Sequence, residues 1–237
     1  MYRTKKHLLL VPYFWDRTLY HRLQSESIKT QAFYLSQHLE MPQYSIVTGF
    51  IGYPQLLTLL GSIEGIKAKE IYFVGTAGAV NEKIGAPISL NITEVFSSSI
   101  YRLFSRQHSF SLKTMPRGNF KTAKSVCVDL PDRETRSWLK QQREYNIDAV
   151  EMELFPLRIF LKKEFTALLV ITDIVKGDGK INLMDRKRIK TEFSRTLQQV
   201  ITILNQFEFF RFFKMSWKLK KQGNSEKKIT QEEILFY

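Results

Sequence analysis

Three short polar segments in this sequence lie where an α/β sheet would bring chemical groups together. Gly75-Thr76-Ala77-Gly78 follows the apolar run Ile71-Tyr72-Phe73-Val74, and Thr172-Asp173 follows the apolar run Leu168-Leu169-Val170-Ile171. The third segment, Val150-Glu151-Met152-Glu153, adds two carboxylates. The apolar runs are typical of buried strands, and the carboxyl ends of parallel strands open onto one crevice. The three segments therefore predict a single small-molecule site that contains carboxylate and hydroxyl groups.

The elements that would position these segments alternate along the chain. Residues 7–11 predict a short strand that ends at Pro12, and residues 17–39 carry apolar side chains at a loosely helical spacing. Residues 183–207 have the apolar period of a long helix that can cover one face of a sheet. The remaining expected strands are residues 45–48, 70–74, 88–96, 125–128 and 165–171, and the remaining expected helices are residues 53–63, 132–145 and a segment between Glu151 and Phe160.

This alternation predicts an α/β fold: a single three-layer domain with a mainly parallel central sheet flanked by helices. The chain has 237 residues, of which 43% are hydrophobic, and this is enough for one substantial core. We expect a domain at residues 1–207 and a C-terminal extension at residues 208–237. The glycines at residues 75–78 predict a turn after the third strand, and residues 97–121 are polar and predict irregular structure.

Cysteine and histidine usage limits the chemistry. Cys127 is the single cysteine, so an internal disulfide is excluded, and the four histidines are scattered without the spacing of zinc ligands. The apolar run near the N-terminus ends at Val11, which is too early for a signal peptide or a membrane span. These features predict a cytoplasmic protein with no metal site and no cofactor.

The net charge of +13 indicates an anionic partner or a set of basic helix faces. The basic residues are spread along the chain, with clusters at residues 186–190 and 218–221. Both clusters fall in expected helices, and no sequence signature of a zinc finger or an RNA-binding sheet accompanies them. We therefore favour solvated helix faces over a nucleic-acid partner.

The C-terminal segment combines aromatic and basic residues. Two interpretations fit this composition: a helix that lies on an anionic lipid surface, or a helix that packs against the core or a second subunit. Because the aromatic residues are so closely spaced, the sequence favours packing over the membrane, followed by a polar tail. The aromatic residues are Phe207, Phe209, Phe210, Phe212, Phe213 and Trp217, and the basic residues beside them are Arg211, Lys214 and Lys218.

The order of a GTAG segment, a Val-Glu-Met-Glu segment and a Thr-Asp pair resembles the purine and uridine phosphorylase superfamily. This superfamily also contains nucleosidases that cleave methylthioadenosine, adenosylhomocysteine and futalosine. The resemblance covers roughly Leu8 to Phe207, and residues 150–153 are its most specific part. It implies a nucleoside as the small-molecule ligand, and it implies a homo-oligomer in which a neighbour completes the sugar pocket.

The resemblance implies a role for each polar segment in binding the nucleoside. Glu153 would accept hydrogen bonds from ribose hydroxyls, and Met152 would pack on the sugar. The alternative for the glutamates is that they are ordinary carboxylates at a helix start, where the helix dipole favours them. The full set of expected substrate-binding residues is Glu153, Met152, Glu151, Thr76, Ala77, Gly78 and Thr172.

By the same resemblance, Asp173 corresponds to the aspartate that protonates or hydrogen-bonds purine N7 as the glycosidic bond breaks. A departing purine accumulates negative charge, and a carboxylic acid of raised pKa in a dry pocket can neutralise it. The alternative is a loop aspartate that caps the turn before Lys176. Thr172 stands where the superfamily usually has serine, and it keeps the hydroxyl.

The nucleophile depends on two further positions. Phosphorylases of the superfamily commonly place a phosphate-binding arginine two residues before the GTAG-like glycine, and Phe73 stands there. Nucleosidases use an acid after the first strand to activate water, and alignment of the strand ends puts Asp16 at that point. The expected function is hydrolysis of a purine-type nucleoside with Asp173 and Asp16 as catalytic residues. A phosphorylase that uses Arg17 for phosphate, or a noncatalytic nucleoside-binding relative, stays open.

Overall fold

The computed structural model describes residues 5–33, 36–50, 52, 55, 68–81, 83–84, 86–97, 106–129, 134–178 and 182–221. Most of the helix expected at residues 53–63 lies outside this described part. The strands are β1 (His7–Val11), β2 (Lys29–Phe33), β3 (Ser36–Glu40), β4 (Tyr44–Thr48), β5 (Glu70–Ala79), β6 (Ser89–Ser97), β7 (Ser109–Ser111), β8 (Lys121–Cys127), β9 (Ala149–Glu151) and β10 (Thr166–Ile174). The helices are α1 (Arg17–Glu26), α3 (Arg136–Glu144), α4 (Leu154–Leu161) and α5 (Arg186–Lys221).

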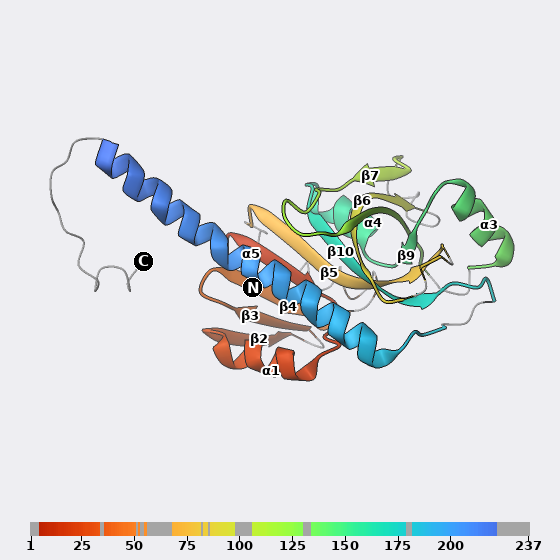
Figure 1. Ribbon diagram of the computed structural model, residues 1–237, viewed down its shortest axis with the longest axis horizontal. Helices are drawn as coiled ribbons and strands as arrows, with labels where there is room; N and C mark the ends of the chain where they lie inside the picture. The colour runs from red at the N-terminus through yellow and green to blue at the C-terminus, as the bar shows by residue number, and fades with distance from the viewer. Residues whose placement is uncertain are drawn as a thin grey trace.

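The sheet is mixed and part of it closes into a barrel, so the expectation of a mainly parallel open sheet is wrong. Strands β1, β4, β5 and β10 pair in parallel, as expected for alternating strands and helices. However, β10 pairs with both β5 and β6, and the path β10-β6-β8-β9-β5 returns to β10. The pairings β6–β10, β5–β9, β2–β3 and β3–β4 are antiparallel. Figure 1 shows the barrel strands beside the flatter β1–β4 part.

Strand β5 belongs to both parts of the sheet. On one edge, residues up to Phe73 pair with β1, and from Gly78 onward the same edge pairs with β9. On its other edge, β5 pairs with β10 from Tyr72 to Ala79. The segment expected to be a glycine turn is therefore the second half of a strand. The turn prediction failed because the long pairing with β10 overrides the local preference of glycine for turns.

Two apolar layers cover the sheet. Along β5 and β10, successive side chains alternate between them: Tyr72 and Leu168 join the layer with α1 and α5, and Phe73 and Leu169 join the layer with α4. The α5 layer includes Phe193, Leu197, Val200 and Leu204, all fully buried. Figure 1 shows α5 running diagonally across the sheet and then beyond it. None of the described helices is long and apolar enough to cross a membrane.

The helix expected at residues 17–39 is wrong beyond Glu26. Helix α1 ends there, and the rest of the segment forms the antiparallel pair β2–β3, whose second strand adds to β4. The helical spacing of apolar residues weakens after Leu23, because the next apolar residue, Ile28, comes five positions later. Ile28 is also 65% exposed in the structure. The pairing of β3 with the edge of β4 therefore makes residues 29–40 a strand pair instead of a helix. The three-residue strand β7 also lies within the segment expected to be irregular.

We predict that Phe193→Ala lowers the free energy of unfolding by about 3–5 kcal/mol, because the ring is fully buried between α5 and the sheet. Urea unfolding followed by circular dichroism measures this loss. Phe160→Ala is the matched control, since Phe160 is 41% exposed and its loss should change stability by less than about 1 kcal/mol. Equal losses in the two variants would contradict the packing described.

Candidate functional site

A cavity of about 170 Å³ opens where β5 changes partner. Between Phe73, the last residue paired with β1, and Gly78, the first paired with β9, residues 74–77 have no strand partner on that edge among the described residues. Two residues of this stretch, Gly75 and Thr76, contribute to the wall of the cavity. It is lined by Pro12, Tyr13, Trp15, Gly75, Thr76 and Glu153.

Glu153 brings a buried carboxylate to this cavity. Its Oε1 accepts a hydrogen bond of 2.7 Å from the amide of Gly52, and its Oε2 accepts one of 3.3 Å from the amide of Met152. Gly52 has a φ of 69°, which favours glycine, and it follows the strand β4 by four residues. Burial raises the pKa of Glu153, although these two amides favour its charged form. The carboxylate is thus held firmly and keeps lone pairs available to a ligand.

Glu151 supports the position of Glu153 by holding the start of α4. Its Oε2 accepts hydrogen bonds of 2.6 Å from the amides of Glu153 and Leu154. Glu153 itself makes no side-chain cap bond to α4, so Glu151 takes the capping role. Burial raises the pKa of Glu151 to about 8, and the Glu153 charge adds to the shift. Glu151 therefore has the helix-start role that the sequence left open, and Glu153 turns toward the cavity.

Asp173 lies opposite Gly78 on the neighbouring strand. The register of β10 against β5 shifts between Ile171 and Asp173, so Thr172 is the extra residue of a bulge. The Thr172 hydroxyl donates a hydrogen bond of 2.9 Å to Asp173 Oδ1 and lies 3.4 Å from the Ala77 carbonyl oxygen. Burial raises the pKa of Asp173 more than the Thr172 bond lowers it. The bulge thus presents a carboxyl group whose pKa lies above its ordinary value.

Gly78 makes room for this arrangement. A Cβ atom at Gly78 would lie 2.9 Å from Asp173 Oδ2 and 2.9 Å from a methyl group of Val175. It would also lie 3.2 Å from a methyl group of Val150 on β9. Glycine is therefore required where β5, β9 and β10 come together. The second glycine, Gly75, accommodates the Phe73 ring, which would lie 2.4 Å from a Cβ there.

The sequence analysis missed Glu134, a second carboxyl group near Asp173. Burial raises the pKa of Glu134 to about 7, and the charge of Asp173 adds to this shift. The next residue, Thr135, bridges to Asp178 in the loop after β10, which brings the segment before α3 to the Asp173 side of the site. Nothing in the spacing around Glu134 marks it, because its proximity to Asp173 arises from tertiary structure alone.

Aromatic side chains from the loop after β1 form one side of the cavity. Tyr13 and Trp15 pack edge to face, with ring centroids 5.9 Å apart, and Tyr13 is 51% exposed. Pro12 and Tyr13 also line a second cavity of about 240 Å³, which the exposed residue Arg17 borders. The two cavities are therefore neighbours. A flat ring could stack on the aromatic side, and an anion could approach Arg17.

Asp16 caps helix α1 and ties it to α5. Its Oδ1 accepts hydrogen bonds from the amides of Thr18 at 3.0 Å and Leu19 at 3.4 Å, and lies 3.2 Å from Lys190 Nζ. Its Oδ2 accepts a hydrogen bond of 3.0 Å from Ser194 Oγ. Burial raises its pKa, but these partners outweigh burial and leave the pKa below its ordinary value. The described residues that line the two cavities do not include Asp16.

The remaining predicted positions fall around the same strands. Met152 is partly buried and packs beside Val150 and Val175. Ala77 is buried in the layer that faces α4. Phe73 is 1% exposed and lies in the same layer, away from solvent. Thr76 and Glu153 thus line the first cavity together, and Thr172, Asp173 and Gly78 form a second cluster on the adjoining strands.

Comparisons with known proteins support this architecture. The sequence matches no family model and no curated protein. In structure, the chain is similar to the 5′-methylthioadenosine/S-adenosyl homocysteine nucleosidase (MTAN) from Campylobacter jejuni, with a TM-score of 0.64 and 14% identity over 85% of this chain and 99% of that one. The MTAN from Chlamydia trachomatis gives a TM-score of 0.59 and 17% identity over 87% and 100%.

A third similar structure is the purine nucleoside phosphorylase from Toxoplasma gondii in complex with immucillin-H. Its TM-score is 0.60, with 13% identity over 85% of this chain and 92% of that one. The fold is therefore that of proteins that cleave or bind nucleosides. More particularly, the chain has the fold of the purine and uridine phosphorylase superfamily, and the resemblance found in the sequence is confirmed at this level.

We predict that Asp16→Ala lowers the free energy of unfolding by about 0.5–2 kcal/mol, because it removes the cap of α1. The folded-state pKa of Asp16 is lowered, so its contribution is present above the unfolded pKa and disappears as the pH falls through the folded value. Thermal unfolding between pH 3 and pH 7 measures this trend. Glu164→Ala, at an exposed residue before β10, is the control, and a loss in Asp16→Ala that does not shrink at low pH would contradict the assignment.

Proposed function

We propose that the protein is a nucleosidase that hydrolyses the N-glycosidic bond of a purine-type nucleoside. The observation that carries the proposal is the half-buried Asp173, whose pKa is raised, on the strand next to the cavity that Glu153 lines. Asp173, as the acid for the nucleobase, and Glu153, as the acceptor for the sugar hydroxyls, then lie on two sides of β5. The similar MTAN structures support the same chemistry.

In this mechanism, the bond between the sugar C1′ and the base nitrogen breaks and its electron pair moves to the base. Asp173 donates its proton to the base nitrogen as this charge develops. The sugar passes through an oxocarbenium-like state, and the Glu153 carboxylate stabilises it through the ribose hydroxyls. Water then adds to C1′ and loses a proton. The products are free base and a ribose moiety.

The surroundings of Phe73 support water over phosphate as the nucleophile. The Phe73 ring lies in the core layer and covers Gly75, so this position offers neither a positive charge nor access to solvent. Lys190 and Ser194 help to hold the pKa of Asp16 below its ordinary value and so favour the charged form, which is the state that a carboxylate needs to orient water. Activation of water by Asp16 stays a prediction, because Asp16 also caps α1.

A nucleoside phosphorylase is the second candidate. The observation in its favour is Arg17, which borders the cavity next to the proposed sugar site. A guanidinium group there can hold phosphate through paired hydrogen bonds. The similar structures include nucleosidases as well as a phosphorylase, so a fold of this kind is compatible with either reaction.

We predict that the purified protein releases free base from a purine nucleoside without added phosphate. A panel of methylthioadenosine, adenosylhomocysteine, futalosine, inosine, adenosine and uridine, analysed by chromatography with and without phosphate, measures this release. If release requires phosphate and is lost in Arg17→Ala, the phosphorylase replaces the nucleosidase. If no substrate is cleaved, the proposed nucleosidase is contradicted and a noncatalytic relative is favoured.

We also predict that Asp173→Asn lowers kcat by about 100-fold or more, because the amide cannot donate an acidic proton. The raised pKa of Asp173 implies that kcat falls as the pH rises through the folded value and the carboxyl group ionises. The pH profile of kcat measures this limb, which should be absent from the variant. Glu164→Gln makes the same change of carboxylate to amide at an exposed residue before β10 and should retain activity, and equal losses in both variants would argue against Asp173 as the acid.

A further inference from the structure

Two buried glutamates meet at the junction of β9 and α4. Glu151 is the last residue of β9, and Glu153 directly precedes α4. Their exposed fractions are 3% and 8%. None of the ion pairs between described residues involves either carboxyl group. Two carboxylates that lie this close in a buried region repel each other, so a pair of this kind tends to hold one proton and one negative charge.

The hydrogen bonds of the pair indicate where the proton lies. Both oxygens of Glu153 accept from backbone amides, Oε1 from Gly52 and Oε2 from Met152. Glu151 Oε2 accepts from the amides of Glu153 and Leu154. Glu151 Oε1 is fully buried and has no hydrogen-bond partner among the described residues. Because an amide donor favours an oxygen without a proton, Oε1 of Glu151 is the oxygen of the pair best suited to hold one.

We infer that Glu151 carries a proton on Oε1 at neutral pH and thereby allows Glu153 to hold the single negative charge of the pair at the sugar site. The described residues that line the cavity include Glu153 and do not include Glu151, so Glu151 is a positioning residue that acts through Glu153. The inference rests on the proposed function in that Glu153 is taken as the acceptor for the ribose hydroxyls. A charged acceptor binds hydroxyl donors more strongly than a neutral one.

The groups around Glu151 favour its neutral form. Cys127 on β8 is the strand partner of Glu151, and its thiol is fully buried. Burial and the Glu151 charge raise the pKa of this thiol well above its ordinary value. Burial and the Glu153 charge raise the pKa of Glu151 to about 8, although the two amides favour its charged form. Cys127 and Glu153 are the titratable groups that act on Glu151 from the described parts of β8 and the start of α4, and neither supplies a positive charge.

Loss of the Glu151 proton would place two negative charges at this junction. The repulsion is relieved if Glu153 takes up a proton or if its side chain turns away from Glu151. Either change weakens the hydrogen bonds that Glu153 accepts from the ribose hydroxyls. Sugar binding should therefore weaken as the pH rises through the pKa of Glu151, which is about 8.

Thermal unfolding at different pH values tests the proton without any ligand. Because folding raises the pKa of Glu151, its contribution to stability is present below the unfolded pKa and is lost as the pH rises through the folded value of about 8. Glu151→Gln imitates the neutral acid and keeps an oxygen that can accept from both amides. The melting temperature of this variant should therefore fall less than that of the wild type between about pH 5 and pH 9.

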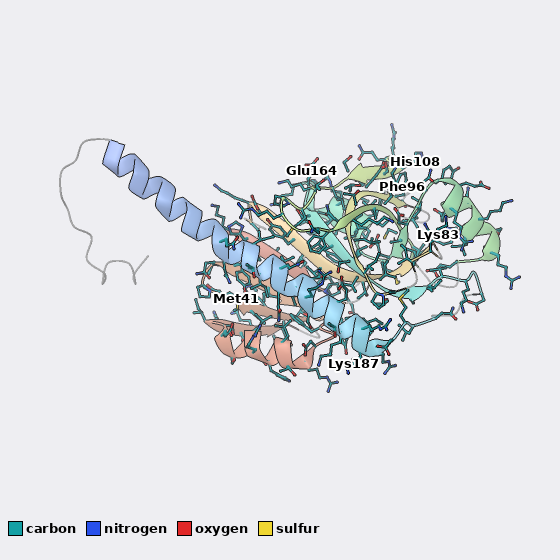
Figure 2. The ribbon with its side chains drawn as sticks, in the orientation of Figure 1. Met41, Lys83, Phe96, His108, Glu164 and Lys187 are labelled. Atoms are coloured by element: carbon teal, nitrogen blue, oxygen red, sulfur yellow. The ribbon has the colours of Figure 1, made fainter. Side chains whose placement is uncertain are left out.

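Glu153→Gln is the matched variant, because it makes the same change two residues away. One of the two amides that Glu153 accepts from would then face an NH2 group, so this variant should be less stable than Glu151→Gln at pH 7. Glu164→Gln should keep the pH dependence of the wild type, since Glu164 is exposed (Figure 2). The inference is overturned if Glu151→Gln is the less stable of the matched pair, or if it follows the pH dependence of the wild type.

Infrared spectroscopy observes the proton directly. At pH 7 the wild type should show the carbonyl stretch of a buried neutral carboxyl group. Part of this band should disappear in Glu151→Gln and remain in Glu164→Gln. An unchanged band in Glu151→Gln would show that Glu151 is ionised and would overturn the inference.

Calorimetry measures the consequence for the sugar. In the Asp173→Asn background, which removes the titration of the proposed acid, adenosine affinity should fall about 10-fold between pH 7 and pH 9. The trend should be absent in Glu151→Gln, and absent for 2′,3′-dideoxyadenosine, which lacks the hydroxyls. An adenosine affinity that does not change with pH would overturn the positioning role. If adenosine does not bind at any pH, the proposed function is contradicted instead, and the unfolding and infrared measurements still decide where the proton lies.

Discussion

The double use of β5 is the constraint on which the rest of the structure depends. One edge of this strand pairs first with β1 and then with β9, which run in opposite directions relative to it. The two partners cannot occupy the same stretch, so a short length of β5 backbone is left between them. That length carries Gly75 and Thr76 to the cavity. The site is thus a consequence of joining an open sheet to a closed barrel.

The same constraint explains why glycine and a bulge occur where they do. Strands β9 and β10 approach β5 from opposite edges at Gly78, and a side chain there would meet Asp173, Val150 and Val175. The bulge at Thr172 then changes the register and presents Asp173 beside Gly78. On the other side, Glu151 holds α4 so that Glu153 is free to accept from the Gly52 amide. Each polar group is therefore positioned by backbone that the apolar layers keep in place.

Local pattern predicted β1, β4, β10 and α5, because these strands are almost fully buried and the buried residues of α5 recur at a helical period. The order of the polar segments also predicted that Glu153 and Thr76 contribute to one site, and both line the first cavity. The hairpin β2–β3 and the barrel closure could not be predicted, since both depend on pairing between distant strands. Glu134 was missed for the same reason, and the capping role of Asp16 depends on contacts with Lys190 and Ser194 across the fold.

Closure of the barrel also affects how the protein can associate through its backbone. Apart from the short stretch of β5 at the cavity, the closed path of strands leaves little free hydrogen-bonding edge, and among the described strands the sheet ends at β2 and at the side strand β7. These strands are only five and three residues long. Lys29 and Gln31 in β2 further disfavour the addition of another strand. The large sheet therefore offers little template for edge-to-edge aggregation, despite its many apolar residues.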